Sequence, residues 1–529
     1  MSENQQTAMT ADELNRQLAA EMAAERAKHG DGDAADIPVV ELADEPTPDE
    51  EYVTAEESVE AVPYPPGPVG DFAKLIEPMC RFPFRPFATV GALIAFATVS
   101  ARKVRFENLY TSLYGFVLAA SSNGKEDVQR VVEDALHAAG LDHNHLMSRV
   151  TSYNAAVEQL QGVWYHPALF AGVDEGAGFL DAARKGEYGL RDFLKEVWSK
   201  CGRWQYPWKR KRNSGNVNLQ PIYHPVLNIF LAAQPEAMGA SSDFAEIQDG
   251  LLPRCIWVVR EDWAKEANTD SPRHFNDLTD TQSGMDIVGR LKRLWNWMWP
   301  FLASLSGDHN HFRDMAEASE HYHEELKGVV GDGEKEGIWP QPIVFGASPQ
   351  VRELFNDFER ECREKGAPGH GKQALLNGLW GKAVENAKRI ALTLAVARCG
   401  PVKIREYGGP PHSPDSHTLK CSEAEIQLDE ARWAIRFIRA SVFSGIRWGR
   451  AHLFESPFQA QCGRVYNVIA AAVAGLKQTD LTRRLQHQYR AKDVREALDA
   501  LEADGRIQRI HVSTKGRTAD GWRAVGKRK

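Results

Sequence analysis

One short stretch of the chain combines residue types that bind phosphate groups. Residues 114–136 read YGFVLAASSNGKEDVQRVVEDAL, which predicts a strand, a turn at Gly124 and Lys125, and a helix. In a phosphate-binding loop, backbone N–H groups and the following helix N-terminus hold phosphates, and a lysine contacts the β and γ phosphates. The spacing therefore predicts a nucleotide-binding loop made of Ala119, Ala120, Ser121, Ser122, Asn123, Gly124, Lys125 and Glu126.

Two residues of this loop depart from the usual pattern. Ala119 stands where the first glycine is expected, and it needs only a tolerable φ angle. Glu126 stands where a Ser or Thr hydroxyl is expected to bind magnesium. Its carboxylate either binds the metal directly or leaves a water in that place, and its charge should weaken triphosphate binding. An ordinary strand–turn–helix that contains Gly-Lys remains the alternative.

Two acidic residues end the next strongly apolar run, ALFAGVDEG. Asp174 lies 49 residues beyond Lys125, and Glu175 follows it directly. A carboxylate at a strand end beside a phosphate loop holds magnesium through water, which predicts that role for Asp174. Glu175 is then the candidate that polarises the attacking water. The alternative is an acidic turn after a buried strand.

Two further polar residues flank the later apolar runs. Gln234 ends the run VLNIFLAAQ, where its side chain could sense the γ-phosphate, orient the water, or merely cap the next turn. Arg254 precedes the run CIWVV and is either an arginine finger or one half of a surface ion pair.

A basic and aromatic stretch lies between the second and third of these apolar runs. Cations attract phosphates, and aromatic rings stack on bases, so the stretch is a candidate contact for single-stranded DNA. An exposed hairpin whose tryptophans pack on the domain is the alternative. The residues concerned are Trp204, Trp208, Lys209, Arg210, Lys211 and Arg212.

The elements that must position these residues define an α/β fold. Helical patterns alternate with short, continuous apolar runs, which indicates a largely parallel sheet covered on both faces. We expect strands at 114–120, 168–175, 226–234 and 255–259. The expected divisions are a disordered acidic region at 1–62, the α/β core at 63–284, a helical extension at 285–455 and a small domain at 456–529.

The small C-terminal domain has the pattern of a winged helix-turn-helix. Three helices precede a hairpin, and one helix buries Val494, Leu498 and Leu501 on a single face. Winged helices bind duplex DNA or dock on proteins, and both roles stay open. The DNA-contact candidates are Arg490, Lys492 and Arg495 at the start of the third helix, with Lys515 and Arg517 in the wing.

Composition limits the other possibilities. The chain has 529 residues and a net charge of −8, but residues 31–60 carry twelve acids and no Lys or Arg. Residues 483–529 carry thirteen Lys or Arg against six acids, which favours a basic contact surface there. The seven cysteines are scattered without a C-x-x-C pair, which favours a reducing cytoplasm over a disulfide framework.

The sequence gives little indication of a signal peptide, a membrane span or a metal site. The N-terminus lacks a signal-peptide pattern, and the longest apolar run, residues 87–101, is too short to span a bilayer, so we expect a buried helix and no membrane partner. Histidines cluster in DHNH at 142–145 and 308–311 and in HYHEE at 321–325, but without a complete ligand spacing.

Residues 70–450 together resemble the RecA-like ATPase domain of phage and mobile-element primase-helicases. The resemblance is carried by NLYTSLYGFVLAASSNGKE, TSYNAAVEQL, LFAGVDEG, LAAQP, DGLLPRCIWVV and GLWGKAVENAKRIALTLAV.

This resemblance implies an ATP- and Mg²⁺-dependent DNA motor, a replicative helicase. Lys125 would contact phosphates, Asp174 magnesium, Glu175 the water, Gln234 the γ-phosphate, and Arg254 the nucleotide of a neighbouring subunit. The resemblance further implies a homo-oligomeric ring such as a hexamer, with loops that face the central channel. Any primase or initiator would be a separate chain, because residues 1–62 are too short and acidic to polymerise. An ATP-switched initiator and a non-catalytic adaptor are the alternatives.

The basic stretch generates the first prediction. Replacing Lys209, Arg210, Lys211 and Arg212 together by Ala should weaken single-strand binding and flatten its dependence on salt. Each lost phosphate contact lowers the slope of log K against log salt by roughly 0.7 for single strands. Affinity measured across a salt series checks this, and an unchanged slope would remove the stretch from the DNA contact.

Overall fold

The computed structural model of the chain describes most of residues 58–525. Residues 1–57 of the expected acidic region lie outside the described residues, as do both His-rich clusters of 308–325. The described ranges are 58–121, 123–147, 153–162, 168–185, 190–201, 210–212, 215–217, 225–241, 247, 250–262, 267–269, 279–297, 342–367, 376–401, 424–453, 457–470, 472, 475–485, 489–514 and 517–525.

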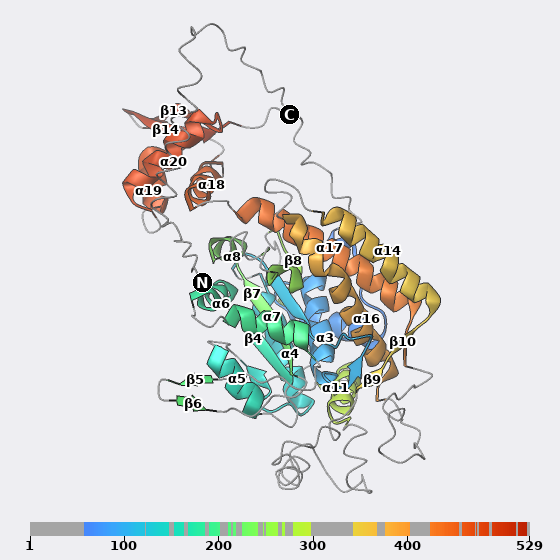
Figure 1. Cartoon of the computed structure of the whole chain (residues 1–529). Coiled ribbons are helices and arrows are strands. Elements are labelled where there is room, and N and C mark those ends of the chain that lie inside the picture. The colour runs from blue at the N-terminus through green and yellow to red at the C-terminus, as the bar shows by residue number, and fades with distance from the viewer. Residues whose placement is uncertain are drawn as a thin grey trace, which may run out of the picture. The chain divides into compact units, whose positions relative to one another are not determined.

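A five-stranded parallel sheet forms the centre of the fold, in the spatial order β3-β4-β7-β2-β8 (Figure 1). Every residue of β2, β4, β7 and β8 is buried, as expected for strands covered on both faces. These four strands were predicted, and the short β3 was not. The strands are β2 (Tyr114–Leu118), β3 (Leu146–Met147), β4 (Ala168–Val173), β7 (Val226–Ala233) and β8 (Cys255–Val259).

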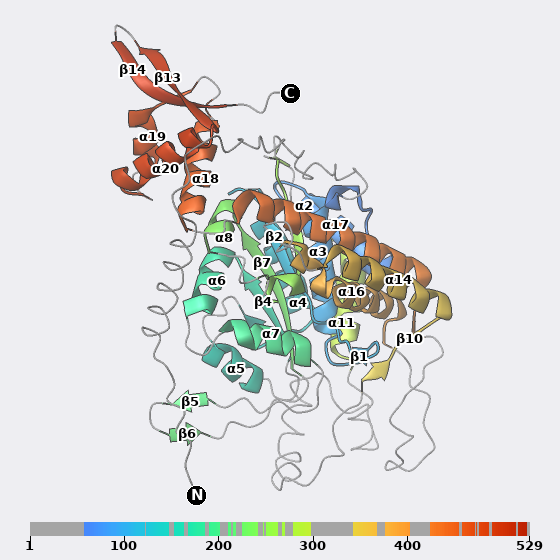
Figure 2. The same ribbon diagram turned by 45° about the horizontal axis from the view of Figure 1, so that its top comes forward.

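Helices cover the two faces of this sheet (Figure 1 and Figure 2). A Cβ atom on Gly115 of β2 would lie 2.4 Å from Val90 of α3, so glycine is required for that close approach. The neighbouring Tyr114 points the opposite way, and its hydroxyl donates to the Leu194 carbonyl of α7 at 2.9 Å. The helices are α3 (Arg85–Val99) and α4 (Lys125–Ala138) on one face, and α6 (Gly176–Lys185) and α7 (Leu190–Lys200) on the other.

The apolar run at 87–101 forms a buried helix, as predicted. All residues of α3 after Arg85 are buried, and Pro86 at its first turn fits the start of a helix. Among the described residues, no helix is both long enough and apolar enough to cross a membrane.

Helix α17 (Leu428–His452) closes the open edge of the sheet along β8. The Ser441 and Ser444 hydroxyls accept the backbone N–H groups of Trp257 at 2.7 Å and Val259 at 3.0 Å. A Cβ atom on Gly445 would lie 2.8 Å from the Trp257 ring, so three small residues on one helix face permit the contact. Unpaired strand edges template aggregation, and this helix removes that liability.

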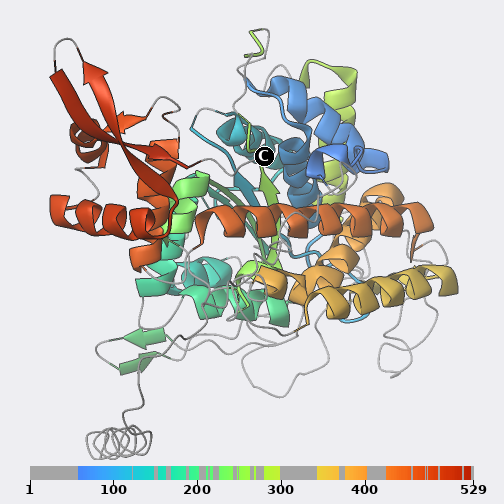
Figure 3. The ribbon, with the colours of Figure 1, turned by 90° about the horizontal axis from the view of Figure 1, so that it is seen from above.

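The helical part of the chain shares one hydrophobic core with the sheet, so the division expected at 284/285 does not separate two cores. The Trp257 ring of β8 stacks on Trp448 of α17 at 4.8 Å. In Figure 3, α17 is the long orange-red helix, and α14 packs alongside it. The other helices of this core are α2 (Gly67–Met79), α11 (Gln282–Trp295), α14 (Pro349–Lys365) and α16 (Ala383–Cys399).

Short elements complete this part of the fold. Two parallel pairs, β1 with β9 and β10 with β11, and one antiparallel hairpin, β5 with β6, lie outside the central sheet. The elements are η3 (Val59–Ala61), β1 (Val104–Arg105), α5 (Tyr153–Gly162), β5 (Arg210–Arg212), β6 (Gly215–Val217), α8 (Pro235–Ser241), η4 (Leu252–Arg254), β9 (Ile343–Val344), β10 (Gly346–Ala347), η5 (Gly378–Lys382) and β11 (Glu425–Ile426).

The C-terminal residues form a separate hydrophobic core. Three helices pack with an antiparallel sheet of order β12-β14-β13, and the predicted face of Val494, Leu498 and Leu501 is buried. The elements are α18 (Pro457–Ala470), β12 (Leu476–Lys477), α19 (Gln478–Leu485), α20 (Ala491–Ala503), β13 (Ile507–Thr514) and β14 (Arg517–Ala524).

The edge closure generates the second prediction. Ser441→Ala and Ser444→Ala each leave a buried strand N–H without its acceptor, which should lower the free energy of unfolding by about 1–3 kcal/mol. Urea denaturation measures the change. Ser283→Ala, an exposed serine on α11, is the matched control and should change stability by less than about 0.5 kcal/mol. Wild-type stability in the Ser441/Ser444 double variant would show that these bonds contribute little.

Candidate functional site

The carboxyl ends of three adjacent strands lie at the same level of the sheet. Leu118 of β2 is aligned with Ala233 of β7 and with Val259 of β8. Parallel strands that end together place the residues that follow them side by side, and ligands of such sheets bind at this edge. The residues concerned are Ala119, Gln234 and Arg260, so the candidate loop starts between a predicted glutamine and an arginine that was not predicted.

The candidate loop has a left-handed glycine directly before its helix. Gly124 has a φ of +81°, and α4 begins at the next residue. Lys125 is buried, and its Nζ lies 3.3 Å from the Ala120 carbonyl and 2.9 Å from the Glu126 carboxylate. The ammonium group therefore lies inside the turn, at the positive end of a helix, with a neighbouring carboxylate as its counter-ion. Ser122 lies outside the described residues.

Gln234 reaches the loop directly. Its Nε2 donates to the Ser121 hydroxyl at 2.7 Å, which links the end of β7 to the turn after β2. The Ala119 N–H donates to the Ala233 carbonyl at 3.1 Å and continues the ladder to the start of the loop. The predicted proximity of Gln234 to the loop is thus present in the fold.

Asp174 and Glu175 lie exposed at the end of β4, with α6 starting at the next residue. One strand, β7, separates β4 from β2, so two strand spacings, or roughly 10 Å, separate the acids from the loop strand.

An acid on α4 extends this negative region. A Cβ atom on Gly172 of β4 would lie 2.2 Å from the Glu133 carboxylate, so this carboxylate lies directly against β4. Burial raises the pKa of Glu133, and the charges of Asp134 and Asp174 act in the same direction while the Gln129 hydrogen bond opposes them. A cation beside Asp174 would relieve this repulsion.

Arg254 lies at the amino end of β8, on the side of the sheet opposite to the carboxyl ends where the loop lies. It precedes β8, so a five-residue strand, roughly 16 Å long, separates it from the loop. Its Nη2 donates to the Ser199 hydroxyl at 2.9 Å, and its guanidinium lies 5.3 Å from the Trp198 ring centre. Burial lowers the pKa of this guanidinium. Arg254 is therefore not brought together with the loop of its own chain.

The DNA-contact candidates are only partly described. Arg210–Arg212 form β5 of a hairpin, while Trp204, Trp208, Lys209 and Lys515 lie outside the described residues. Arg490, Lys492 and Arg495 are exposed at the start of α20, and Arg517 begins β14. Farther along α20, the exposed face is acidic: Glu496 pairs with Lys492 at 3.6 Å, while Asp499 and Glu502 pair with Arg509 of β13.

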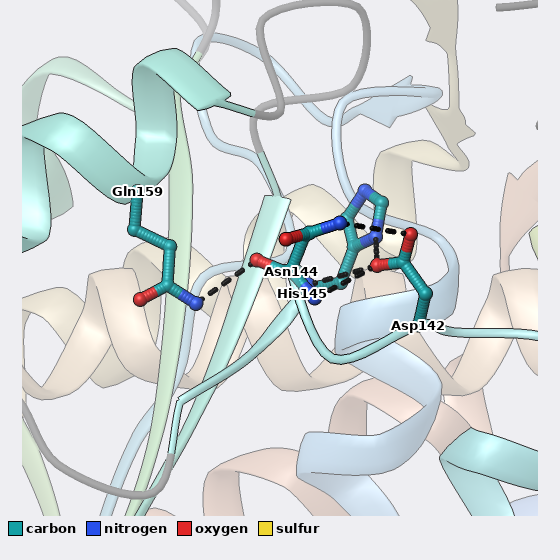
Figure 4. Close-up of polar contacts among 4 residues, drawn as sticks. All are labelled: Asp142, Asn144, His145 and Gln159. Atoms are coloured by element: carbon teal, nitrogen blue, oxygen red, sulfur yellow. Dashed lines mark hydrogen bonds and ion pairs between the residues drawn. The ribbon is translucent and has the colours of Figure 1, made fainter.

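The described histidine cluster is a turn. Figure 4 shows the Asp142 carboxylate accepting the Asn144 N–H at 2.9 Å and contacting His145 Nδ1 at 2.8 Å, while Gln159 donates to the Asn144 carbonyl. The His145 ring is buried edge-on against Trp295. Burial acts to raise the pKa of Asp142, but hydrogen bonds with His145 and Asn144 and the charge of His145 together lower it below its ordinary value. This cluster shapes the entry to β3.

Sequence reasoning missed Arg260. Its backbone N–H donates to the Leu118 carbonyl at 2.8 Å, and its side chain contacts the Phe82 carbonyl and the Phe84 ring. The signal was present, because Arg260 directly follows the apolar run CIWVV just as Gln234 follows its own run. No group of three or more His, Cys, Asp or Glu residues in the described ranges could hold a metal ion by itself.

No protein-family model matches the chain, and no curated protein matches it in sequence. The interpretation of the site therefore depends on its geometry and chemistry.

The Lys125–Glu126 pair generates the third prediction. Glu126→Ser removes the carboxylate that holds the lysine and repels a triphosphate, so affinity for Mg-ATP should rise between about 2- and 5-fold, the range of a half-exposed ion pair of up to about 1 kcal/mol. Calorimetric titration measures it, with Glu353→Ser on the exposed face of α14 as the control. A loss of affinity confined to magnesium-containing buffer would contradict this and assign Glu126 to the metal.

Proposed function

We propose that the chain is an ATP-dependent DNA motor of the RecA-like class, a replicative helicase of a phage or mobile element that translocates on single-stranded DNA. The observation that carries the proposal is that three separately predicted features lie at the carboxyl ends of the strands of one sheet. These are the loop around Lys125, the amide of Gln234 and the acidic pair Asp174–Glu175.

The residues fit a nucleotide with magnesium. A buried ammonium group and a helix N-terminus attract phosphates, and the αL glycine lets the backbone turn around them. Magnesium binds to one or two carboxylates together with substrate phosphates, so Asp174, with or without Glu126, suffices without a complete protein cage. Bound there, the metal would neutralise charge on the phosphates.

The remaining residues have separate roles in hydrolysis. Glu175 orients and polarises the attacking water, because it is the exposed carboxylate next to Asp174. Gln234 connects the γ-phosphate position to the loop through Ser121. Arg254 can serve as a finger only toward the nucleotide of a neighbouring subunit, because β8 separates it from its own loop. That requirement favours a ring-shaped homo-oligomer, and the arginine would have to leave Ser199 to act.

DNA contact would use two surfaces. The β5–β6 hairpin carries consecutive basic residues that suit a single strand. The C-terminal unit, α18 to β14, is interpreted as a winged helix. It would approach duplex DNA with the first turn of α20, since the acids on the later turns would repel phosphates.

One observation favours a second function. The Glu126 carboxylate contacts the Lys125 ammonium group at 2.9 Å and would compete with a phosphate for it, as expected for an adaptor with a degenerate site or for an initiator that binds ATP as a slow switch. A switch would bind DNA and ATP without displacing a strand, and an adaptor would not turn over ATP.

The fourth prediction tests the motor directly. Single-stranded DNA should stimulate ATP turnover by the wild-type chain. Lys125→Ala should lose nucleotide affinity, whereas Glu175→Gln should retain bound ATP and lose at least about 10²-fold in turnover, the scale of general-base contributions. Steady-state hydrolysis and nucleotide binding are measured in parallel, with Glu236→Gln at an exposed site on α8 as the matched control.

Two outcomes would contradict the proposal in different ways. Equal turnover in the wild type and both variants would remove Lys125 and Glu175 from the site. DNA-stimulated turnover without strand displacement on a forked substrate would favour the switch over the helicase.

A further inference from the structure

The segment that joins α2 to α3 lies against the candidate phosphate loop. A Cβ atom on Gly124 would lie 2.7 Å from the Phe82 carbonyl oxygen and 3.3 Å from the Phe82 Cβ. Phe82 is half-buried, so part of its surface is accessible beside the turn. An aromatic residue therefore adjoins the glycine where α4 begins, although 42 positions separate the two in the sequence.

This segment is fixed from two sides. The Arg81 N–H donates to the Asp127 carboxylate in the first turn of α4 at 2.9 Å. Arg260, at the end of β8, directs Nη1 to the Phe82 carbonyl at 3.4 Å, and the Asn268 N–H donates to the Arg81 carbonyl at 2.7 Å. Residues 81–84 thus form a wall that is held in place before any ligand binds.

The two phenylalanines of the wall have different surroundings. The Phe84 ring packs edge-on against Phe87 at 4.7 Å, and the Arg260 guanidinium lies 4.8 Å from its centre. Phe84 thereby anchors the wall. The Arg81 guanidinium lies over one face of the Phe82 ring, 5.5 Å from its centre, so a planar aromatic ligand would stack on the opposite face.

The position of the acids determines which end of a nucleotide faces this wall. Asp174 and Glu175 follow β4, on the β7 side of β2. The acids that follow β8, Glu261 and Asp262, are paired with Arg447 and Arg260, so the γ-phosphate with its metal belongs on the β4 side. Arg260 and residues 81–84 lie on the β8 side. We infer that Phe82 stacks on the base of the bound nucleotide, with Arg260 as a positioning residue. This inference rests on the proposed ATP site.

The fifth prediction separates the base from the phosphates. Binding of Mg-ATP and of magnesium tripolyphosphate, which has no base, is measured by calorimetry on the wild type, Phe82→Ala and Lys125→Ala. Phe82→Ala should weaken ATP between about 5- and 150-fold, the equivalent of 1–3 kcal/mol for one stacked base, and leave tripolyphosphate unchanged. Lys125→Ala should weaken both. Phe82→Tyr, which keeps the ring, should retain ATP affinity.

Phe458→Ala, at an exposed phenylalanine in the C-terminal unit, is the control and should change neither affinity. Equal losses of both ligands in Phe82→Ala would mean that the wall only supports the loop, which overturns the inference. Wild-type ATP affinity in Phe82→Ala, while Lys125→Ala still weakens both ligands, would overturn the base contact and leave the proposed function standing. Failure of the wild type to bind either ligand would overturn both.

Discussion

The parallel register of β2 with its two neighbours is the constraint on which the candidate site depends. Leu118, Ala233 and Val259 are aligned, and backbone bonds from Ala119 to Ala233 and from Arg260 to Leu118 extend the ladder past the strand ends. A slip of one residue would turn each side chain to the opposite face. Gln234 and Arg260 would then no longer flank the loop, and Gly124 would lose its fit against Phe82.

Strand β8 connects the candidate site to the rest of the molecule. Arg260 lies at its carboxyl end beside the loop, and Arg254 lies at its amino end on Trp198. The same Trp198 supports the buried Arg389 of α16, whose guanidinium lies 4.1 Å from the ring centre and donates to the Trp198 carbonyl at 2.8 Å. Helix α17 also bonds to the middle and the carboxyl end of β8, at Trp257 and Val259.

Charged groups of both signs surround the candidate loop. Lys125 is buried with a carboxylate beside it, the exposed Asp174 and Glu175 follow β4, and Arg260 on the β8 side is paired with the exposed Asp262 at 3.4 Å. Glu126 departs from the phosphate-loop pattern, since it places a negative charge where that pattern has a hydroxyl.

Local sequence determined the elements and much of the candidate site. Continuous apolar runs predicted β2, β4, β7 and β8, because a strand buried on both faces must be apolar throughout. Apolar residues spaced three and four apart predicted α4, which buries Val128, Val131, Val132, Ala135 and Leu136. Gly124 and Lys125 identified the turn, since few other residues adopt its backbone conformation or place a cation inside it.

Tertiary structure decided the features that join distant residues. Strand β3 has only two residues, too few for a period to be visible, and its place comes from pairing with β4. Ser441 lies 184 residues from Trp257, and nothing in the sequence around it indicates that its hydroxyl accepts a hydrogen bond from a strand N–H. The same holds for Phe82 at Gly124 and for Arg254 on Trp198. Periodicity and propensity act within one element, whereas these contacts arise only when separate elements pack into one core.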